Sequence, residues 1–218
     1  VPSIEQSVDT LKRLSAQVGK EKVAWRYDPV LLTEKYTVER HFKTFDHMAH
    51  ELSPYVDRCI FSFVEMYKKL AVNMPELQPI GDDDKLLLVK GLGAISKQYG
   101  LYLQTCAAKD DYLQFGVHRS GCMTTEIFSR ALGLNFKRQA HKGNRIGCAC
   151  MESRGLGDYN SCPNGCRYCY ANKDHAKAAE NYRRHNPTSP LLLGDVLPSD
   201  TIKSAVQNSL VDKLGTLF

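Results

Sequence analysis

The chain has 218 residues, 43% hydrophobic and 24% charged, a composition typical of a packed globular protein and not of a disordered one. Its formal net charge is +5, and its eight cysteines are too few for the disulfide scaffold of a short secreted domain. No uncharged apolar run approaches the roughly 18 residues of a membrane-spanning helix, so we expect no span in these residues.

The first half of the chain alternates between helical and strand-like patterns. Apolar residues at helical spacing, preceded by capping residues, predict helices over 3–18, 37–52 and 82–99. Short runs rich in β-branched and aromatic residues predict strands over 23–28, 59–64 and 101–106. Pro29 is expected to stop the first strand because proline cannot extend a hydrogen-bonded ladder. This repeated order implies right-handed crossovers and a parallel sheet or barrel.

The second half of the chain has a different character. A short helix is expected near residues 124–132, and a loop rich in Gly, Lys and Cys follows over 133–172. Loops of this length inside compact domains are usually functional. A basic helical stretch over 176–184 is then followed by a proline-punctuated connector, and an amphipathic helix over 202–214 is expected to close the chain.

Five of the eight cysteines fall within 22 residues: Cys148, Cys150, Cys162, Cys166 and Cys169. The last three form a C-x3-C-x2-C motif inside the run YNSCPNGCRYCYAN. Thiolates are soft anionic donors, and three at these spacings can each ligate a different iron of one iron–sulfur cluster. Gly165 helps the chain to turn tightly around such a cluster, and the fourth iron is left open to another ligand.

The motif, with an aromatic residue before its third cysteine, resembles the signature of radical S-adenosylmethionine (radical SAM) enzymes. The wider run is similar to the version in the spore-photoproduct-lyase-like branch. The whole chain, from WRYDP through GCAC and YCYAN to the closing Leu-Phe, resembles DUF1848, a bacterial family of unknown function described as carrying a radical-SAM-like cysteine cluster near its C-terminus. The 218 residues resemble roughly the C-terminal two-thirds of a family member, so we expect further βα units and any targeting segment to lie upstream.

The radical SAM resemblance implies roles for particular residues. Cys162, Cys166 and Cys169 would ligate a 4Fe–4S cluster, and Tyr168 would lie near the adenine of SAM. The open iron would bind SAM, and one electron would cleave it to methionine and a 5′-deoxyadenosyl radical. The usual Gly-Gly-Glu motif for the SAM amino group is absent from these 218 residues. Only 49 residues follow Cys169, so the resemblance implies a partial or permuted barrel.

A second metal site is a further hypothesis. Cys122, Cys148 and Cys150 could hold zinc or an auxiliary cluster, with Cys106 or His118 as a further ligand. The alternative is that these cysteines are small buried thiols, which is our interpretation of Cys106 and Cys59 inside the predicted strands.

Zinc is also an alternative at the main motif. A set of four thiolates from Cys148, Cys150, Cys166 and Cys169 could hold it, although Cys162 would then have no role. Disulfide pairing is the weakest interpretation, because three thiols lie within eight residues.

Polar residues at the carboxyl ends of the predicted strands are candidates for a substrate pocket, since barrel active sites gather there. These candidates are Arg26, Asp28, Glu65 and Thr105. A polar residue in such a place is often only a turn or a cap, and Asp28 with Pro29 could simply end its strand.

Basic residues surround the cysteine motif. The segment 135–185 holds ten Lys and Arg against four acidic residues, while the rest of the chain is close to neutral. This excess either compensates an anionic metal–thiolate centre or contacts nucleic acid. Cysteines without a sign of an oxidising compartment favour a reducing cytoplasm.

The sequence therefore predicts an α/β fold, with TIM-like βα-barrel units over 1–132 and a Cys-rich cluster-binding segment with packed C-terminal helices over 133–218. The expected function is that of a radical-SAM-like enzyme of unknown substrate, with a 4Fe–4S cluster, SAM, and a ferredoxin or flavodoxin as electron donor. The alternative is a non-enzymatic zinc or iron–sulfur module that contacts nucleic acid.

Overall fold

A computed structural model describes residues 2–143, 147–153, 155–206 and 208–213. The helices are α1 (Ile4–Val18), α2 (Val38–Leu52), α3 (Lys68–Asn73), α4 (Asp82–Gln98), α5 (Thr125–Leu132) and α6 (His175–Arg184). The strands are β1 (Trp25–Val30), β2 (Arg58–Phe63), β3 (Tyr102–Thr105) and β4 (Val117–Arg119), and short 3-10 turns lie at Lys20–Lys22 and Leu113–Phe115.

The chain divides into two compact units. The first, here called the sheet unit, comprises Pro2–Glu65, Glu76–Ser153 and Leu210–Phe218. The second, here called the loop unit, comprises Met66–Pro75 and Arg154–Ser209. No described helix has both the length and the apolar character required to cross a membrane.

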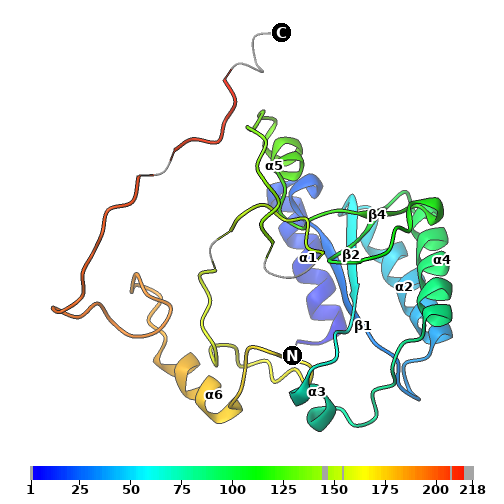
Figure 1. The fold of residues 1–218 in the computed structure, drawn as a ribbon, viewed down its shortest axis with the longest axis horizontal. Helices are drawn as coiled ribbons and strands as arrows, with labels where there is room; N and C mark the ends of the chain where they lie inside the picture. The colour runs from blue at the N-terminus through cyan, green and yellow to red at the C-terminus, as the bar shows by residue number, and fades with distance from the viewer. Residues whose placement is uncertain (1, 144–146, 154, 207, 214–218) are drawn as a thin grey trace. The chain divides into compact units, whose positions relative to one another are not determined.

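The sheet unit is built on a parallel sheet of order β1-β2-β3-β4 (Figure 1). Its register pairs Arg26 with Ile60, Ile60 with Gln104, and Gln104 with His118. Because side chains alternate along a strand, these four residues share one face. We call it the polar face; Ser62, two residues after Ile60, belongs to it as well.

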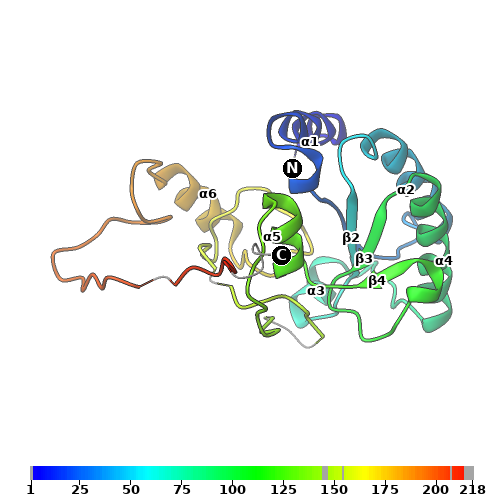
Figure 2. The same cartoon turned by 90° about the horizontal axis from the view of Figure 1, so that it is seen from above.

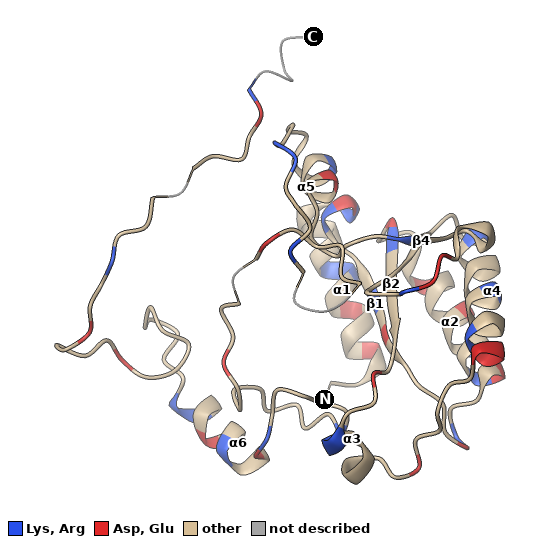
Figure 3. Cartoon of the chain, viewed as in Figure 1, with Lys and Arg blue, Asp and Glu red and all other residues tan. Residues whose placement is uncertain are grey.

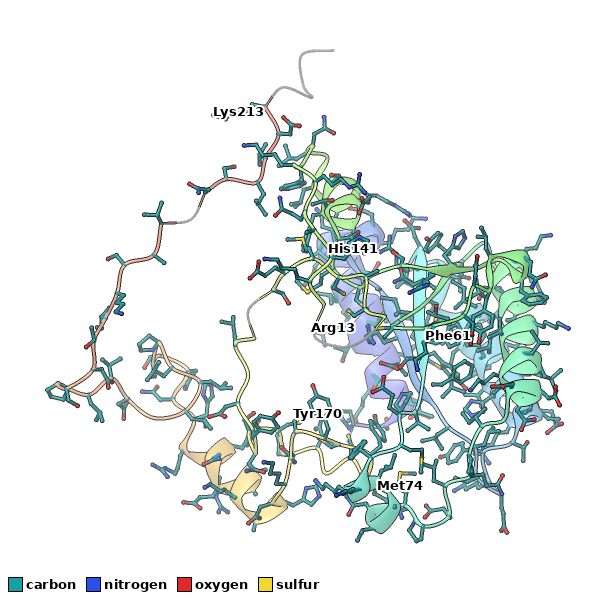
Figure 4. The ribbon with its side chains drawn as sticks, viewed as in Figure 1. Arg13, Phe61, Met74, His141, Tyr170 and Lys213 are labelled. Atoms are coloured by element: carbon teal, nitrogen blue, oxygen red, sulfur yellow. The ribbon has the colours of Figure 1, made fainter. Side chains whose placement is uncertain are left out.

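The opposite face of the sheet carries the hydrophobic core. Helices α2 and α4 lie on the same side of the sheet in both views (Figure 1 and Figure 2). Trp25 stacks on Phe45 of α2 with ring centroids 4.8 Å apart, and Phe61 packs in the same cluster (Figure 4). Burying side chains of this size contributes about 1.5–3 kcal/mol each. The other buried residues of this core include Cys59, Leu88, Val89, Leu92, Leu103 and Val117.

The predicted helices and strands of the first half are confirmed. Helix α1 begins after Ser3, whose hydroxyl accepts a hydrogen bond from the Gln6 amide while the Gln6 side chain accepts one from the Ser3 amide. Thr37 and Thr124 cap α2 and α5 with their hydroxyls, which accept from the Arg40 and Ile127 amides. The mixed α/β class and the parallel sheet are confirmed for the described residues, whereas closure into a barrel stays a prediction.

One expected strand end was wrong, and two short elements were not predicted. β1 continues through Pro29 to Val30. It is the first strand in the order of the described sheet, and its pairing with β2 shifts register between Tyr27 and Val30. Pro29 therefore interrupts no hydrogen-bonded ladder there. Strand β4 and helix α3 were not predicted, since both are very short.

The amphipathic helix expected over 202–214 is absent from its described residues. Ile202 and Val206 are 81% and 91% exposed, so no apolar face is buried to stabilise a helix. Leu210 instead accepts a backbone hydrogen bond from the Lys137 amide at 2.8 Å. Leu214, the last residue of the predicted stripe, lies outside the described residues.

Candidate functional site

The C-x3-C-x2-C motif lies in a loop of the loop unit that is closed at its base. The Asn160 amide donates to the Ala171 carbonyl at 3.2 Å, which joins the two ends of the loop. The Asn160 side-chain oxygen accepts from the Lys173 and Asp174 amides at 2.6 and 2.9 Å, and its carbonyl accepts from Asn181 of α6 at 2.8 Å. All three cysteines of the motif therefore belong to one ring of backbone.

Inside this loop, backbone and side-chain amides connect the cysteines. The Cys169 amide donates to the Cys166 carbonyl at 3.0 Å, and the Asn172 amide donates to the Cys169 sulfur at 3.4 Å. The Asn172 side-chain nitrogen donates to the Cys162 carbonyl. Gly165 has a φ of 65°, which L side chains rarely adopt, so glycine suits this turn. Cys162 is exposed, and Cys166 and Cys169 are half-buried.

Helix α3 and the residue before it hold the loop by its carbonyl groups. The Tyr67 hydroxyl donates to the Tyr168 carbonyl, and the Lys69 ammonium donates to the carbonyls of Cys169, at 3.4 Å, and Asn172. Burial raises the pKa of Tyr67, and the nearby Cys169 thiol raises it further. These contacts place a cation and a phenol beside the motif.

Asn172 is the most enclosed polar side chain of the loop unit. It is 1% exposed, and its side-chain oxygen has no hydrogen-bond partner among the described residues. A buried acceptor without a donor is costly, and such groups in native proteins usually meet a ligand or water. The loop therefore has an unused acceptor beside its cysteines, available to a ligand with an N–H or O–H donor.

The donor set of the loop fits an iron–sulfur cluster in its chemistry. Three thiols in one closed loop, with an amide directed at the Cys169 sulfur, are the ligands and the hydrogen bond that such clusters use. In the described part of the chain, no group of three or more His, Cys, Asp or Glu side chains is already positioned to hold a metal ion. The roles of Cys162, Cys166 and Cys169 as ligands stay predictions.

The other cysteines of the second-site hypothesis gather beyond the carboxyl ends of β3 and β4 in the sheet unit. The Cys122 and Cys106 sulfurs are 3.4 Å apart, and the Cys122 amide donates to the Cys150 sulfur at 3.1 Å. Burial raises the pKa of the Cys148 thiol, and the neighbouring thiols of Cys150 and Cys106 add to this effect. Four thiols from three separate segments thus adjoin one another.

Arg26 and Asp28 connect this thiol group to the polar face. The Arg26 guanidinium lies 2.6 Å from the Asp28 carboxylate and 3.1 Å from the Cys122 sulfur, and Ser62 donates to the same carboxylate. Burial opposes the charge of Arg26, but its bonds to Asp28 and Cys122 outweigh burial and raise its pKa. The Cys106 thiol and burial raise the pKa of Cys122.

The structure brings only part of the predicted substrate pocket together. Arg26 and Asp28 form an ion pair on the polar face. Thr105 shares a face with Leu103 in the core, is 2% exposed and donates to the His118 carbonyl at 3.4 Å. Glu65, two residues after β2 ends, is exposed.

Tyr168 and His118 were also predicted from the sequence, as a SAM contact and a metal ligand. The side chain of Tyr168 is 39% exposed. His118, offered as a further ligand of the second site, stacks on Tyr102 with ring centroids 4.2 Å apart. The mixed zinc set draws Cys148 and Cys150 from the sheet unit and Cys166 and Cys169 from the loop unit, and stays a prediction.

Sequence reasoning missed the polar residues that support both thiol groups. Gln104, fully buried on the polar face, donates to the Gly121 carbonyl at 3.1 Å and so holds the segment that carries Cys122. An amide in the middle of an apolar strand was the signal that could have revealed it. Tyr67 and Lys69 gave no such signal, because they lie about a hundred residues before the motif.

Comparison with protein families finds one match: the model described as "Domain of unknown function (DUF1848)" matches residues 1–171. The matched region includes all eight cysteines. Comparison with curated proteins and with solved structures finds no match.

Proposed function

Because this chain belongs to the DUF1848 family of unknown function, we propose from its own residues that it is an iron–sulfur protein with radical-SAM-like activity. In this proposal Cys162, Cys166 and Cys169 hold a 4Fe–4S cluster. The observation that carries it is the closure of the loop: one ring of backbone, joined at Asn160 and Ala171, contains all three thiols and directs an amide at one of them.

Three protein ligands leave one iron of the cluster for SAM. When bound, the cluster would supply the electron for reductive cleavage of SAM, and the hydrogen atom removed next would come from an unidentified substrate. The chain's own residues prepare this site: Lys69 stabilises the backbone around Cys169, and the Asn172 side-chain oxygen offers an acceptor to a bound ligand. We assign Tyr168, which is partly exposed, to SAM contact.

The remaining parts of the proposal concern the fold, the substrate and the surroundings. The parallel sheet supports a partial or permuted βα barrel, and its polar face, with Arg26 and Asp28, supports a substrate pocket. The closely spaced cysteines suit a reducing cytoplasm, and a ferredoxin or flavodoxin would be the electron donor.

A nucleic-acid role is the second candidate function. It is supported by exposed cations on and beside α6, whose Lys and Arg are visible in Figure 3: Lys173, Lys177, Arg183 and Arg184. Arg184 lies 3.8 Å from Glu180 one turn earlier, so part of this charge is compensated within the helix. Binding to DNA would weaken steeply as salt rises.

The proposal is tested by electron paramagnetic resonance of anaerobically reconstituted full-length protein. We expect about four irons per chain and a reduced-cluster signal whose shape changes when SAM is added. Incubation with SAM and a strong reductant should then yield 5′-deoxyadenosine. The variant with Cys162, Cys166 and Cys169 all changed to Ala should lose the signal and the product.

The matched control is Cys59→Ala, which removes a buried core thiol of the sheet unit and should keep both the signal and the product. Full-length protein that holds no iron contradicts the cluster. Protein that holds the cluster but neither changes signal with SAM nor forms 5′-deoxyadenosine contradicts the enzyme proposal, and salt-dependent DNA binding would then favour the module.

A further inference from the structure

Besides the core thiol Cys59, the sheet unit has four cysteines, none of which belongs to the loop that carries the proposed cluster. They come from three places: Cys106 directly after β3, Cys122 after β4, and the Cys148–Cys150 pair. Each end of β3 and β4 is fixed by the sheet, so two of these thiols start from rigid elements. Nothing in the proposed iron–sulfur chemistry uses them.

We propose that Cys106, Cys122, Cys148 and Cys150 bind one zinc ion as a closed site of four thiolates. This inference goes beyond the proposed function and does not depend on it. Zinc in structural sites is tetrahedral, with four protein ligands and no open position. Besides the buried core thiol Cys59, the sheet unit supplies four thiols, whereas the loop unit supplies three.

The spacing of the Cys106 and Cys122 sulfurs favours a single metal ion over a cluster. Four sulfurs bound to one tetrahedral zinc at about 2.3 Å lie about 3.8 Å from one another. The Cys106 and Cys122 sulfurs are 3.4 Å apart, close to that separation. Thiolates that ligate different irons of a cluster stand farther apart, because each extends outward from its own iron.

The backbone around these thiols is closely packed. A Cβ added to Gly121 would lie 2.5 Å from the Ala149 carbonyl oxygen and 2.8 Å from the Cys150 amide nitrogen. A Cβ on Gly143 would lie 2.3 Å from the Cys148 sulfur. Gly121 and Gly143 therefore let the segment around Cys148 and Cys150 approach Cys122, and any larger residue would force it away.

The polar surroundings suit an anionic thiolate centre. Four thiolates around a divalent ion carry a net negative charge, and the Arg26 guanidinium lies 3.1 Å from the Cys122 sulfur. The Cys122 amide donates to the Cys150 sulfur at 3.1 Å, and hydrogen bonds of this kind orient metal ligands and tune the bound metal. His118 is not needed as a ligand, since its ring stacks on Tyr102.

The four sulfurs do not yet surround one point, since no group of three such side chains in the described residues is positioned to hold a metal ion. Cys106 and Cys122 form the fixed half of the site. Zinc binding would draw Cys148 and Cys150 toward them.

The experiment measures zinc and iron separately in full-length protein isolated anaerobically. We expect about one zinc per chain, unchanged when Cys162, Cys166 and Cys169 are all replaced by Ala. Cys122→Ser and Cys150→Ser should each remove the zinc and leave the iron, whereas Cys59→Ala should keep both metals. Gly121→Ala should weaken zinc retention against a chelator at least tenfold, with Gly157→Ala, which adds a Cβ in open space, as its control.

A second measurement needs no variant and therefore does not depend on a variant's folding. X-ray absorption at the zinc edge of the unmodified protein should show four sulfur neighbours at about 2.3 Å. Nitrogen or oxygen neighbours overturn the four-thiolate site. The site is also overturned if the protein contains no zinc, or if the zinc disappears with the loop cysteines. It is overturned as well by iron bound at these four cysteines or by a Cys106–Cys122 disulfide in the anaerobic protein. Loss of iron alone contradicts only the proposed function.

Discussion

The sheet unit and the loop unit are held together by different means. The sheet unit has a continuous hydrophobic core on one face of a parallel sheet. In the loop unit only Leu70, Met74, Asn172 and Ala178 are buried among the described residues, and polar bonds to backbone carbonyls connect the segments. The sheet unit can fold on apolar burial, whereas the loop unit buries few side chains, and the proposed metal would add to its stability.

The largest expected effect is on the loop unit when its metal is removed. Structural metal binding contributes roughly 10–16 kcal/mol in small domains, far more than four buried side chains can. Chelation of the iron should therefore speed amide hydrogen exchange in residues 158–172 by at least about tenfold and leave α2 unchanged. Hydrogen-exchange mass spectrometry checks this; equal exchange in the loop with and without iron contradicts it.

The next largest effect is on the core of the sheet unit. Phe45 is fully buried and stacks on Trp25, so Phe45→Ala should lower the free energy of unfolding by about 3–5 kcal/mol. Leu113→Ala, at a side chain 57% exposed, should change it by less than about 0.5 kcal/mol. Urea denaturation of both variants measures the difference, and similar losses would show that the core has been misidentified.

A smaller effect is expected inside the cysteine loop. Asn172→Ala removes the bond to the Cys162 carbonyl and should cost about 1–3 kcal/mol of loop stability, because that carbonyl loses its buried partner. The readout is the fraction of iron kept after anaerobic gel filtration, which should fall. Asn164→Ala, at an exposed position of the same loop, should retain the iron. A similar loss of iron in both variants would show that Asn172 does not support the site.

The smallest effect is a pH dependence confined to the sheet unit. Buried His41 lies 2.7 Å from both the Tyr27 hydroxyl and the Leu31 carbonyl, and burial lowers its pKa. Its neutral form is thus favoured in the folded state, so its contribution to stability is present above about pH 6.5 and is lost as pH falls. His41→Phe should flatten the stability curve below that pH. The exposed-site control is His50→Gln, and an equal change in both variants contradicts the assignment.

Much of the sheet unit could be predicted because its signals are local. The Ser3–Gln6 capping box and the apolar spacing of α2 each specify a helix from neighbouring residues. Pro29 misled the prediction of β1, since proline's effect depends on whether its strand lies at an edge of the sheet. The apolar stripe within 202–214 led to the wrong prediction of a helix, because a helix needs a surface on which to bury such a stripe.

The two candidate sites likewise differ in whether their residues are close together in the sequence. The spacing of Cys162, Cys166 and Cys169 is visible in the sequence, because one loop contains all three. The contact between Cys106 and Cys122 could not be predicted from the sequence. Each cysteine follows a different strand, and only the register of β3 and β4 brings them together. Helix α3 was likewise hidden, since its contacts with the loop span about a hundred residues.

Native mass spectrometry of the anaerobic full-length protein tests most directly whether the two units carry separate metal centres. We expect a mass increase equal to one 4Fe–4S cluster plus one zinc. The variant lacking Cys162, Cys166 and Cys169 should retain only the zinc, and Cys122→Ser should retain only the cluster. A single metal species that disappears in both variants would contradict the account.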